Sequence, residues 1–558
     1  MLYPRMNLYR DVHSLNGIWN FKTVEDTYIP MEAGKNVISM PVPASFNEIV
    51  TDRKTRDHVG KVLYETDFSI PLREDRLYRL RIGAASHKCE VWLNGKKIGE
   101  GINGYYPIDL PLENLQAENR LSVVIDNRLD FWCLPTGKCE NGKQVINHDF
   151  YNYTGIHRDV LIYTLPEKHI DDIVISTVVG GDYRKISVDV RSNCEQFRYT
   201  VFDREKRKVA EGDSGELIIP EPQLWSPKNP YLYTLAVQTE SDRYEERFGI
   251  RKISVTDRSV LLNDEPVYFK GFGMHEDFTV MGKGKNTPLN IRNFELLKWI
   301  HANSFRTSHY PYSEEMMDLA DEYGILVIDE VPAVGMIAWE GGCFTPERIN
   351  GKTAGLHKEL IKQLVERDKN HPCVVMLSLA NEPASHEKGA KEYFEDIFAY
   401  ARTVSDLPLT FAENMPFPQD LCCQFCDVIL LNRYYAWYDF HGELDGIQEA
   451  LKSEIENFYN LHHKPIILSE FGADTIEGIH SLPAESFSEE FQLECVSEAC
   501  KTLDGFDYCI GELVWNFADF KTKQGLTRAR GNRKGVFTRD RQPKMVAHYL
   551  RNRWENKS

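Results

Sequence analysis

The sequence contains no long hydrophobic run. No stretch approaches the roughly 18 consecutive apolar residues that a membrane-spanning helix requires. The amino terminus also lacks the apolar core of a secretion signal. We therefore expect a cytoplasmic protein with no membrane partner.

Positive charge is scarce relative to negative charge. The chain has 66 Lys and Arg residues against 84 Asp and Glu residues, a formal net charge of −18. Such a surface repels phosphate backbones and anionic lipid headgroups. Nucleic acid is therefore not an expected partner.

Paired cysteine motifs are missing. The 12 cysteines are scattered, and without a secretion signal we expect reduced thiols in the core rather than disulfides. Cys422, Cys423 and Cys426 form the one local cluster. A zinc site would need a second pair at suitable spacing, and none is nearby in the sequence. We expect no metal and no organic cofactor.

No internal repeat or low-complexity segment divides the chain, but 558 residues exceed one compact core. Residues 1–166 carry short strand-like segments, including a hairpin over 90–98 with Asn94-Gly95 at its turn, and predict a β-sandwich. Residues 167–256 predict a smaller immunoglobulin-like β-sandwich, with strands at 186–190 and 231–237.

From residue 257 to 558, predicted strands alternate with predicted helices. This alternation over about 300 residues is typical of a (β/α)8 TIM barrel. The expected strands are 267–270, 304–307, 325–329, 374–379, 409–412, 428–431, 466–469 and 510–514, and the expected helices are 291–302, 314–323, 356–368, 388–404, 447–461 and 489–502.

Two glutamates end apolar runs of this barrel. Glu382 follows the fourth predicted strand and Glu470 ends the seventh. The carboxyl ends of barrel strands carry the chemistry in this architecture. A pair of carboxyl groups, one protonated and one ionised, is what glycosidic bond cleavage requires. A salt-bridged residue at a strand end is the alternative for either glutamate alone.

The motifs around these glutamates resemble those of family 2 glycoside hydrolases. The sequence SLANEP at 378–383 is similar to the acid/base motif of that family, and LSEFG at 468–472 to its nucleophile motif. The resemblance covers nearly the whole chain and implies a jelly-roll sandwich, an immunoglobulin-like sandwich and a TIM barrel. It implies that Glu382 is the acid/base, Glu470 the nucleophile, and Asn381 a donor to the sugar 2-hydroxyl.

A basic segment follows the last predicted strand. Residues 521–544 contain nine Lys and Arg residues against one acid, Asp540. Fixed cationic donors at this end of the barrel would suit an anionic sugar. On charge alone, a solvated run that pairs with acidic neighbours is an equal alternative.

Within this segment, GNRKG at 531–535 resembles the uronate-recognition motif of the β-glucuronidases in family 2, and GVFTRDR at 535–541 is similar to their bacterial members. The resemblance implies that Asn532 and Lys534 bind the sugar carboxylate. LNRYYAWY at 431–438 and NHDFYNYTGIHR at 147–158 also resemble segments of this group. Further substrate-binding residues implied are Asp149, Asn432, Tyr434, Tyr438, Trp515 and Arg528. His275 and His309 end the first two strands, and orienting roles and satisfied core positions are equally open for them.

The expected function is that of a retaining exo-β-glucuronidase acting on small-molecule or oligosaccharide β-glucuronides. A β-galactosidase, β-mannosidase or galacturonidase with the same mechanism is the nearest alternative, and a non-catalytic carbohydrate-binding protein is a further one. The resemblance suggests a homo-oligomer, a tetramer or dimer. The segment 333–345 is shorter than the corresponding loop of some bacterial members, which predicts a more open approach for the aglycone.

Overall fold

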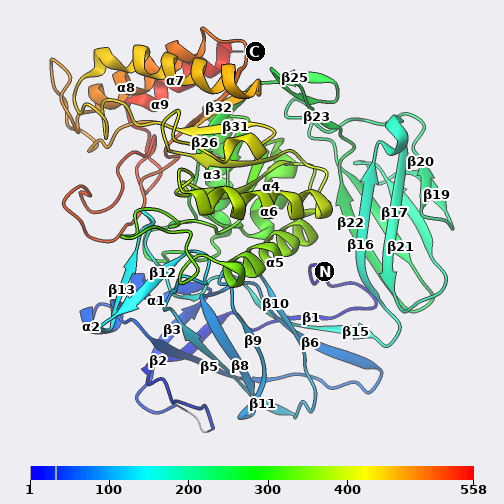
Figure 1. Ribbon diagram of the computed structural model, residues 1–558. Coiled ribbons are helices and arrows are strands. Elements are labelled where there is room, and N and C mark those ends of the chain that lie inside the picture. Colours follow the sequence, from blue (N-terminus) through cyan, green and yellow to red (C-terminus); the bar gives the residue numbers. More distant parts are fainter. Residues whose placement is uncertain (1, 32–33, 558) are drawn as a thin grey trace.

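Two β-sandwiches lie against one barrel. The computed structural model describes residues 2–31 and 34–557. Figure 1 shows the first sandwich in blue below the barrel, the second in teal to its right, and α7, α8 and α9 at the opposite side from the first sandwich. The predicted combination of folds is confirmed.

The first sandwich packs a six-stranded sheet on a four-stranded sheet. Side chains from both sheets share one core, which includes Phe21, Val123 and Ile162. The predicted hairpin is present, and Asn94 and Gly95 both have positive φ angles, 51° and 79°, as a type I′ turn requires. The six-stranded sheet consists, in order, of β3 (Ile38–Val42), β2 (Gly17–Val24), β5 (Lys61–Ser69), β11 (Glu118–Asp126), β8 (Lys88–Leu93) and β9 (Lys96–Gly101). The four-stranded sheet consists of β1 (Val12–Ser14), β15 (Val160–Pro166), β6 (Arg76–Ile82) and β10 (Ile108–Pro111).

The smaller elements of this part are α1 (Phe46–Ile49), α2 (Arg53–Arg56), β4 (Ala44–Ser45), β7 (Ala85–Ser86), β12 (Gly137–Glu140), β13 (Lys143–Ile146) and β14 (Gly155–Ile156). The two one-turn helices lack the periodicity by which a helix is recognised in sequence. Asp52 caps α2 by accepting from the Thr55 amide at 2.8 Å.

The second sandwich has three strands in one sheet and four in the other. A strand was expected at 231–237, but β21 begins two residues later, since the Tyr231 amide donates to Asn229 O in a turn beside Pro230. The three-stranded sheet consists of β16 (Ile170–Thr177), β17 (Lys185–Ser192) and β20 (Glu216–Ile218). The four-stranded sheet consists of β19 (Lys208–Gly212), β18 (Arg198–Phe202), β21 (Tyr233–Gln238) and β22 (Arg243–Phe248).

A three-stranded sheet leads into the barrel. It consists of β23 (Ile253–Val255), β24 (Val260–Leu262) and β25 (Glu265–Val267). Val267 pairs with Val260 in this sheet, so the first barrel strand, expected at 267–270, begins only at Phe269.

Eight parallel strands close the barrel. Every residue of β29 and β32 is buried, as expected for strands with helices outside and side chains within. The strands are β26 (Phe269–Gly273), β27 (Ser304–Arg306), β28 (Leu326–Glu330), β29 (Val374–Asn381), β30 (Leu409–Glu413), β31 (Ile429–Asn432), β32 (Ile466–Glu470) and β33 (Cys509–Val514).

Six predicted helices cover the barrel and a terminal helix follows them. The helix expected at 291–302 instead begins four residues earlier, because Asn286 caps it by accepting from the Leu289 amide and Pro288 lies in its first turn. The helices are α3 (Thr287–Trp299), α4 (Glu314–Tyr323), α5 (Gly351–Asp368), α6 (Lys388–Val404), α7 (Ile447–His462), α8 (Glu489–Leu503) and α9 (Met545–Asn556). Over the part of the chain described here, no helix has both the length and the apolarity needed to cross a membrane.

Candidate active site

The two glutamates lie at the ends of barrel strands. Glu470 is the last residue of β32, and Glu382 directly follows β29. Glu382 has a φ of 47°, in the left-handed region, which costs a non-glycine residue roughly 1–2 kcal/mol. Its amide donates to Ala412 O at 2.8 Å, so the neighbouring strand β30 holds this conformation in place.

Glu470 receives two strong donors. Arg306, the last residue of β27, donates from Nη2 to Glu470 Oε1. Tyr434 donates its hydroxyl hydrogen to Glu470 Oε2 at 2.5 Å. Both donors favour the ionised form of the carboxylate.

Arg306 links Glu470 to a second buried carboxylate. Its Nη1 donates to both oxygens of Glu330, at 2.8 and 2.7 Å. Ser378 also donates to Glu330 at 2.6 Å, and His309 Nδ1 lies 3.0 Å from it. We did not expect Arg306 or Glu330 in the site. A charged residue inside a buried strand, facing an acid at the end of the next strand, is the signal that could have found them.

Among the described residues, the side-chain donors to the Glu382 carboxyl group are amides. Asn432, the last residue of β31, donates from Nδ2 to Glu382 Oε1 at 2.8 Å. Asn414, just past β30, places its Nδ2 at 3.5 Å from Glu382 Oε2. Asn432 was expected to bind the sugar, but its amide is occupied by Glu382 and Asn381, and its Oδ1 accepts from Ser469.

The Asn381 side chain is held through its oxygen. Arg306 Nη1 donates to Asn381 Oδ1 at 3.2 Å and Asn432 Nδ2 lies 3.4 Å from the same atom. Within residues 2–31 and 34–557, its Nδ2 group donates to no protein acceptor. The Nδ2 group of Asn381 is therefore available to donate to a ligand.

Burial raises the pKa of both glutamates. Burial raises the pKa of Glu470 to about 8, and Glu382 adds to the rise, whereas Arg306 and Tyr434 oppose it. Burial also raises the pKa of Glu382, against the hydrogen bond from Asn432 and the charge of Arg306. The pair of carboxyl groups therefore retains a proton near neutral pH.

A cationic cluster lies beside Tyr434. Lys534 is fully buried, and its Nζ donates to Asp474 Oδ2 at 2.8 Å and to the Tyr438 hydroxyl at 3.0 Å. Arg528 donates to the same hydroxyl at 2.6 Å, and its Nη1 lies 3.3 Å from Asp474 Oδ2. The rings of Tyr438 and Tyr434 are 5.1 Å apart, which joins this cluster to Glu470.

Asp149 of the first sandwich closes the cluster. Its carboxylate accepts from Arg528 Nη2 at 2.7 Å and from Asn532 Nδ2 at 2.9 Å. Asn532 also accepts from the Lys534 amide at 3.0 Å, which fixes the turn carrying Lys534. Five predicted residues, Asp149, Tyr438, Arg528, Asn532 and Lys534, thus meet at one place, whereas Asp474 had no sequence signal.

Most of the basic segment has structural partners. Lys544 donates to Asp519 at 2.8 Å, and Arg539 donates to Asp277 at 2.5 Å. Lys521 donates to Glu48 of the first sandwich at 2.5 Å. Pairing with acidic neighbours therefore accounts for these residues, and of the segment's cations only Arg528 and Lys534 enter the cluster described above.

Trp515 and the two histidines form an aromatic layer. Trp515 stacks on His309 with ring centroids 5.2 Å apart and meets His275 edge-on at 5.4 Å. A Cβ atom on Gly273 would lie 2.5 Å from Trp515 Cε3, so glycine is required beneath this ring. Burial lowers the pKa of both histidines well below its usual range, so they are neutral at pH 7.

The connection after the third barrel strand is fastened to the first sandwich. Asn147 donates to Ile337 O at 2.7 Å, and the Thr136 amide donates to Val334 O at 3.0 Å. The Glu387 carboxylate accepts from the amides of Cys343 and Phe344. The segment is therefore held at both of its ends.

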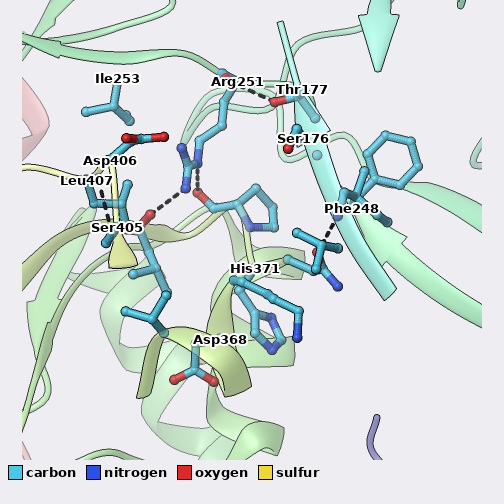
Figure 2. A pocket seen from close by; sticks show the side chains of 18 of the residues that line it. Ser176, Thr177, Phe248, Arg251, Ile253, Asp368, His371, Ser405, Asp406 and Leu407 are labelled. Atoms are coloured by element: carbon cyan, nitrogen blue, oxygen red, sulfur yellow. Dashed lines mark hydrogen bonds between the residues drawn. The ribbon is translucent and has the colours of Figure 1, made fainter. Parts of the chain in front are cut away.

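A separate cavity of about 480 Å³ lies between the second sandwich and the barrel. Figure 2 shows side chains that line it. Its lining includes Val374, where β29 begins, and Leu407, just before β30, so it lies at the opposite end of these strands from Glu382. Arg251 crosses it and donates to the carbonyls of Pro372 and Val374 at 2.6 Å each. This cavity is distinct from the site of the two glutamates.

Comparison with known proteins gives the same architecture. Three family models match, described as Glycosyl hydrolases family 2, sugar binding domain, over residues 12–166, Glycosyl hydrolases family 2 over 158–251, and Glycosyl hydrolases family 2, TIM barrel domain, over 253–558. A β-glucuronidase of Paenibacillus borealis is 41% identical, with 99% of this chain and 98% of that protein covered. One of Felis catus is 40% identical over 99% and 92%.

Solved structures agree with these matches. A β-glucuronidase of an uncultured Clostridium species superposes with a TM-score of 0.97 and 43% identity, with 100% of both chains covered. A Ruminococcus gnavus β-glucuronidase in complex with uronic isofagomine gives 0.94 and 37% over 99% of each chain. The family models cover the barrel and both sandwiches, and the chain belongs to family 2 of the glycosyl hydrolases.

Proposed function

We propose that this protein is a retaining exo-β-D-glucuronidase, which hydrolyses β-glucuronides to glucuronate and an aglycone. The observation that carries the proposal is a buried lysine and an arginine, Lys534 and Arg528, beside a nucleophile–acid pair. The β-glucuronidases to which the chain is similar support the same substrate class.

The charges of the cluster suit one carboxylate. Lys534 and Arg528 carry two positive charges, and buried Asp474 neutralises one of them. Asp149 is more exposed, with 42% of its side chain accessible, so its contact with Arg528 is the one a ligand can replace. A uronate carboxylate would then receive donors from Lys534, Arg528 and Asn532, while Asp149 accepts from sugar hydroxyls.

The hydrogen-bond donors around the two glutamates indicate which of them carries the shared proton. Glu470 accepts from a guanidinium and a phenol, both of which stabilise its charge. Glu382 accepts only from amides, which stabilise a charge less. Glu470 is therefore the ionised nucleophile, and Glu382 is the protonated acid.

The reaction proceeds in two displacements. Glu470 attacks the anomeric carbon as Glu382 gives its proton to the glycosidic oxygen, so the aglycone leaves as an alcohol and a glycosyl ester forms on Glu470. Glu382 then removes a proton from water, which attacks the same carbon and releases glucuronate and the Glu470 carboxylate. Asn381 Nδ2, the free donor, binds the sugar 2-hydroxyl during both steps.

The test compares two substrates that differ at C5. We expect Lys534→Met to lower kcat/KM on an aryl glucuronide by on the order of 10²–10³-fold, because a buried charged contact is lost. The same variant should change kcat/KM on the matching aryl glucoside far less. Lys523→Met is the matched control, since Ile146 O is the one acceptor of Lys523 Nζ among the residues that the structure describes.

Equal losses on both substrates would remove the uronate assignment. Faster turnover of a galacturonide, galactoside or mannoside by the wild type would assign another sugar. Proton NMR of the first product formed tests retention, for which β-glucuronate must appear before the α-anomer.

We also propose a cytoplasmic location and a homo-oligomer, the second of which the family resemblance supports. The short 333–345 segment supports an open approach for the aglycone. Light scattering of the purified protein measures its oligomeric state. Comparison of kcat/KM for a small aryl glucuronide with that for a glucuronide-ended oligosaccharide tests the approach for the aglycone. Equal values would support an open approach.

A further inference from the structure

One buried guanidinium is shared by two carboxylates. The Arg306 side chain is fully buried, and its Nη1 donates to both oxygens of Glu330, at 2.8 and 2.7 Å, while its Nη2 donates to Glu470. Glu330 ends β28 and Glu470 ends β32, so the two acids belong to strands that are not neighbours in the barrel. The charge on Glu330 opposes the charge on Glu470, because both interact with the same cation and repel each other.

The contacts of Glu330 keep it ionised. Its Oε1 accepts from Arg306 and lies 3.0 Å from His309 Nδ1, and its Oε2 accepts from Arg306 and, at 2.6 Å, from the Ser378 hydroxyl. Two contacts at each oxygen use all the lone pairs of a carboxylate and leave no place for a proton. The neutral ring of His309 therefore carries its hydrogen on Nδ1.

The same guanidinium also orients Asn381. Arg306 Nη1 donates to Asn381 Oδ1 at 3.2 Å, and this contact leaves the Asn381 Nδ2 group available to a ligand. Since Glu330 holds Nη1 by two short hydrogen bonds, it fixes the direction of the whole planar group. Glu330 thus acts on both Glu470 and Asn381 through Arg306.

We infer that Glu330 is a positioning residue for the attack by Glu470: it fixes the Arg306 guanidinium and takes a share of its charge. The inference rests on the proposed function, because it takes Glu470 as the nucleophile. A buried carboxylate without a cation takes up a proton and cannot attack. One that a cation stabilises fully attacks slowly, because that stabilisation is lost as its charge moves into the new bond. Sharing the cation places Glu470 between these limits.

A purely structural ion pair is the alternative, and Glu512 in β33 provides an example. Its side chain is also fully buried, and Arg553 of α9 donates to its two oxygens at 2.8 Å each. Tyr268 and Trp554 complete its contacts at 2.9 and 2.5 Å. Glu512 matches Glu330 in burial and in its arginine partner, but Arg553 does not donate to either catalytic glutamate, so Glu512 provides the control.

The experiment compares the pH profiles of kcat/KM on an aryl glucuronide for the wild type, Glu330→Gln and Glu512→Gln. Glu330 raises the pKa of Glu470 and Arg306 lowers it. In Glu330→Gln the guanidinium acts on Glu470 alone, so the pKa of Glu470 falls and the acid limb should move down by roughly one unit. The plateau kcat should fall by about 10- to 100-fold with KM nearly unchanged. Glu512→Gln should lower Tm but move neither the limb nor the plateau.

An acid limb that stays in place in Glu330→Gln would reduce Glu330 to a structural ion pair and overturn the inference. Should that variant fail to fold, Ser378→Ala decides the matter. Loss of the Ser378 hydrogen bond leaves more of the Glu330 charge to oppose that of Glu470, so the limb should move slightly upward, and an unmoved limb rejects the inference. If the wild type does not hydrolyse the glucuronide, the proposed function fails, and the same profiles on the aryl glycoside that it does hydrolyse test Glu330 separately.

Discussion

The two halves of the active site are held by different kinds of structure. Glu470 ends β32 and Glu382 directly follows β29, so backbone ladders fix both. The cluster of Lys534, Arg528 and Asn532 lies between β33 and α9, in a segment tied by isolated bridges such as Phe520 to Asn532. Isolated backbone bridges and side-chain contacts, rather than continuous ladders, place those three residues. In the proposed mechanism the chemistry depends on barrel geometry and sugar selection depends on charge pairing, so the two should be separable by mutation.

Removing the proposed nucleophile should disrupt the catalytic half alone and have the largest effect. We expect Glu470→Gln to lower kcat by on the order of 10⁴–10⁶-fold, because no covalent intermediate forms. Calorimetry should show that an aryl glucuronide still binds, since the cationic cluster is intact. Glu477→Gln, an exposed glutamate in the loop after β32, is the control. Wild-type turnover by Glu470→Gln would contradict the assignment.

Removing one cation breaks the other half. Arg528→Met should lower kcat/KM on an aryl glucuronide by about 10- to 100-fold, since a charged hydrogen bond contributes about 1.5–3 kcal/mol. The change should fall on KM more than on kcat, because this contact is made equally in the ground and transition states. Arg530→Met, in an exposed residue two positions along, should have no such effect. A loss confined to kcat would mean that the two halves are coupled.

Tyr434 contacts both halves of the site, and the substitution Tyr434→Phe should change the pH profile of kcat/KM. The Tyr434 hydrogen bond lowers the pKa of Glu470, so Tyr434→Phe raises it. Glu470 is then ionised only at higher pH, and the acid limb of kcat/KM should move upward by roughly one unit. Activity at pH 6 falls more than activity at pH 8. Tyr435→Phe, whose ring stacks on Phe440, is the control, and an unmoved limb argues against the role.

The smallest effect tests the amides around Glu382. Asn414→Ala should lower kcat by about 2- to 10-fold, the value of one neutral hydrogen bond. Asn432→Ala should cost more, because Asn432 lies 2.8 Å from Glu382 and Asn414 lies 3.5 Å away. The reverse order would show that Asn414 holds the proton-bearing oxygen more tightly than its distance suggests.

The same contrast explains what the sequence could predict. Apolar runs ended by Glu382 and Glu470 identify both the strands and the acids, because burial and strand direction are local properties. Arg306 lies inside a predicted strand, and its meeting with Glu330 and Glu470 depends on the order in which strands close the barrel.

Other features depend on contacts that no local pattern contains. Asp474 meets Lys534 across 60 positions of sequence. The sequence predicted that Asn432 binds the sugar, and in the structure its side-chain amide donates to Glu382. Which neighbour accepts from that amide depends on small differences in distance that the sequence does not contain. Most of the nine basic residues pair with acids, so charge density alone did not separate Lys534 from Lys544.

The position of Asp149 has a consequence for protein engineering. A residue from the amino-terminal unit completes a site that the barrel otherwise builds, with Tyr153 donating to Asp277 at 2.9 Å beside it. Chimeras that exchange only the barrel between relatives would therefore inherit a mismatched partner for Arg528. Transfer of selectivity between such enzymes should require exchange of the 147–158 segment together with the barrel. At this junction the three folding units are therefore not independent modules.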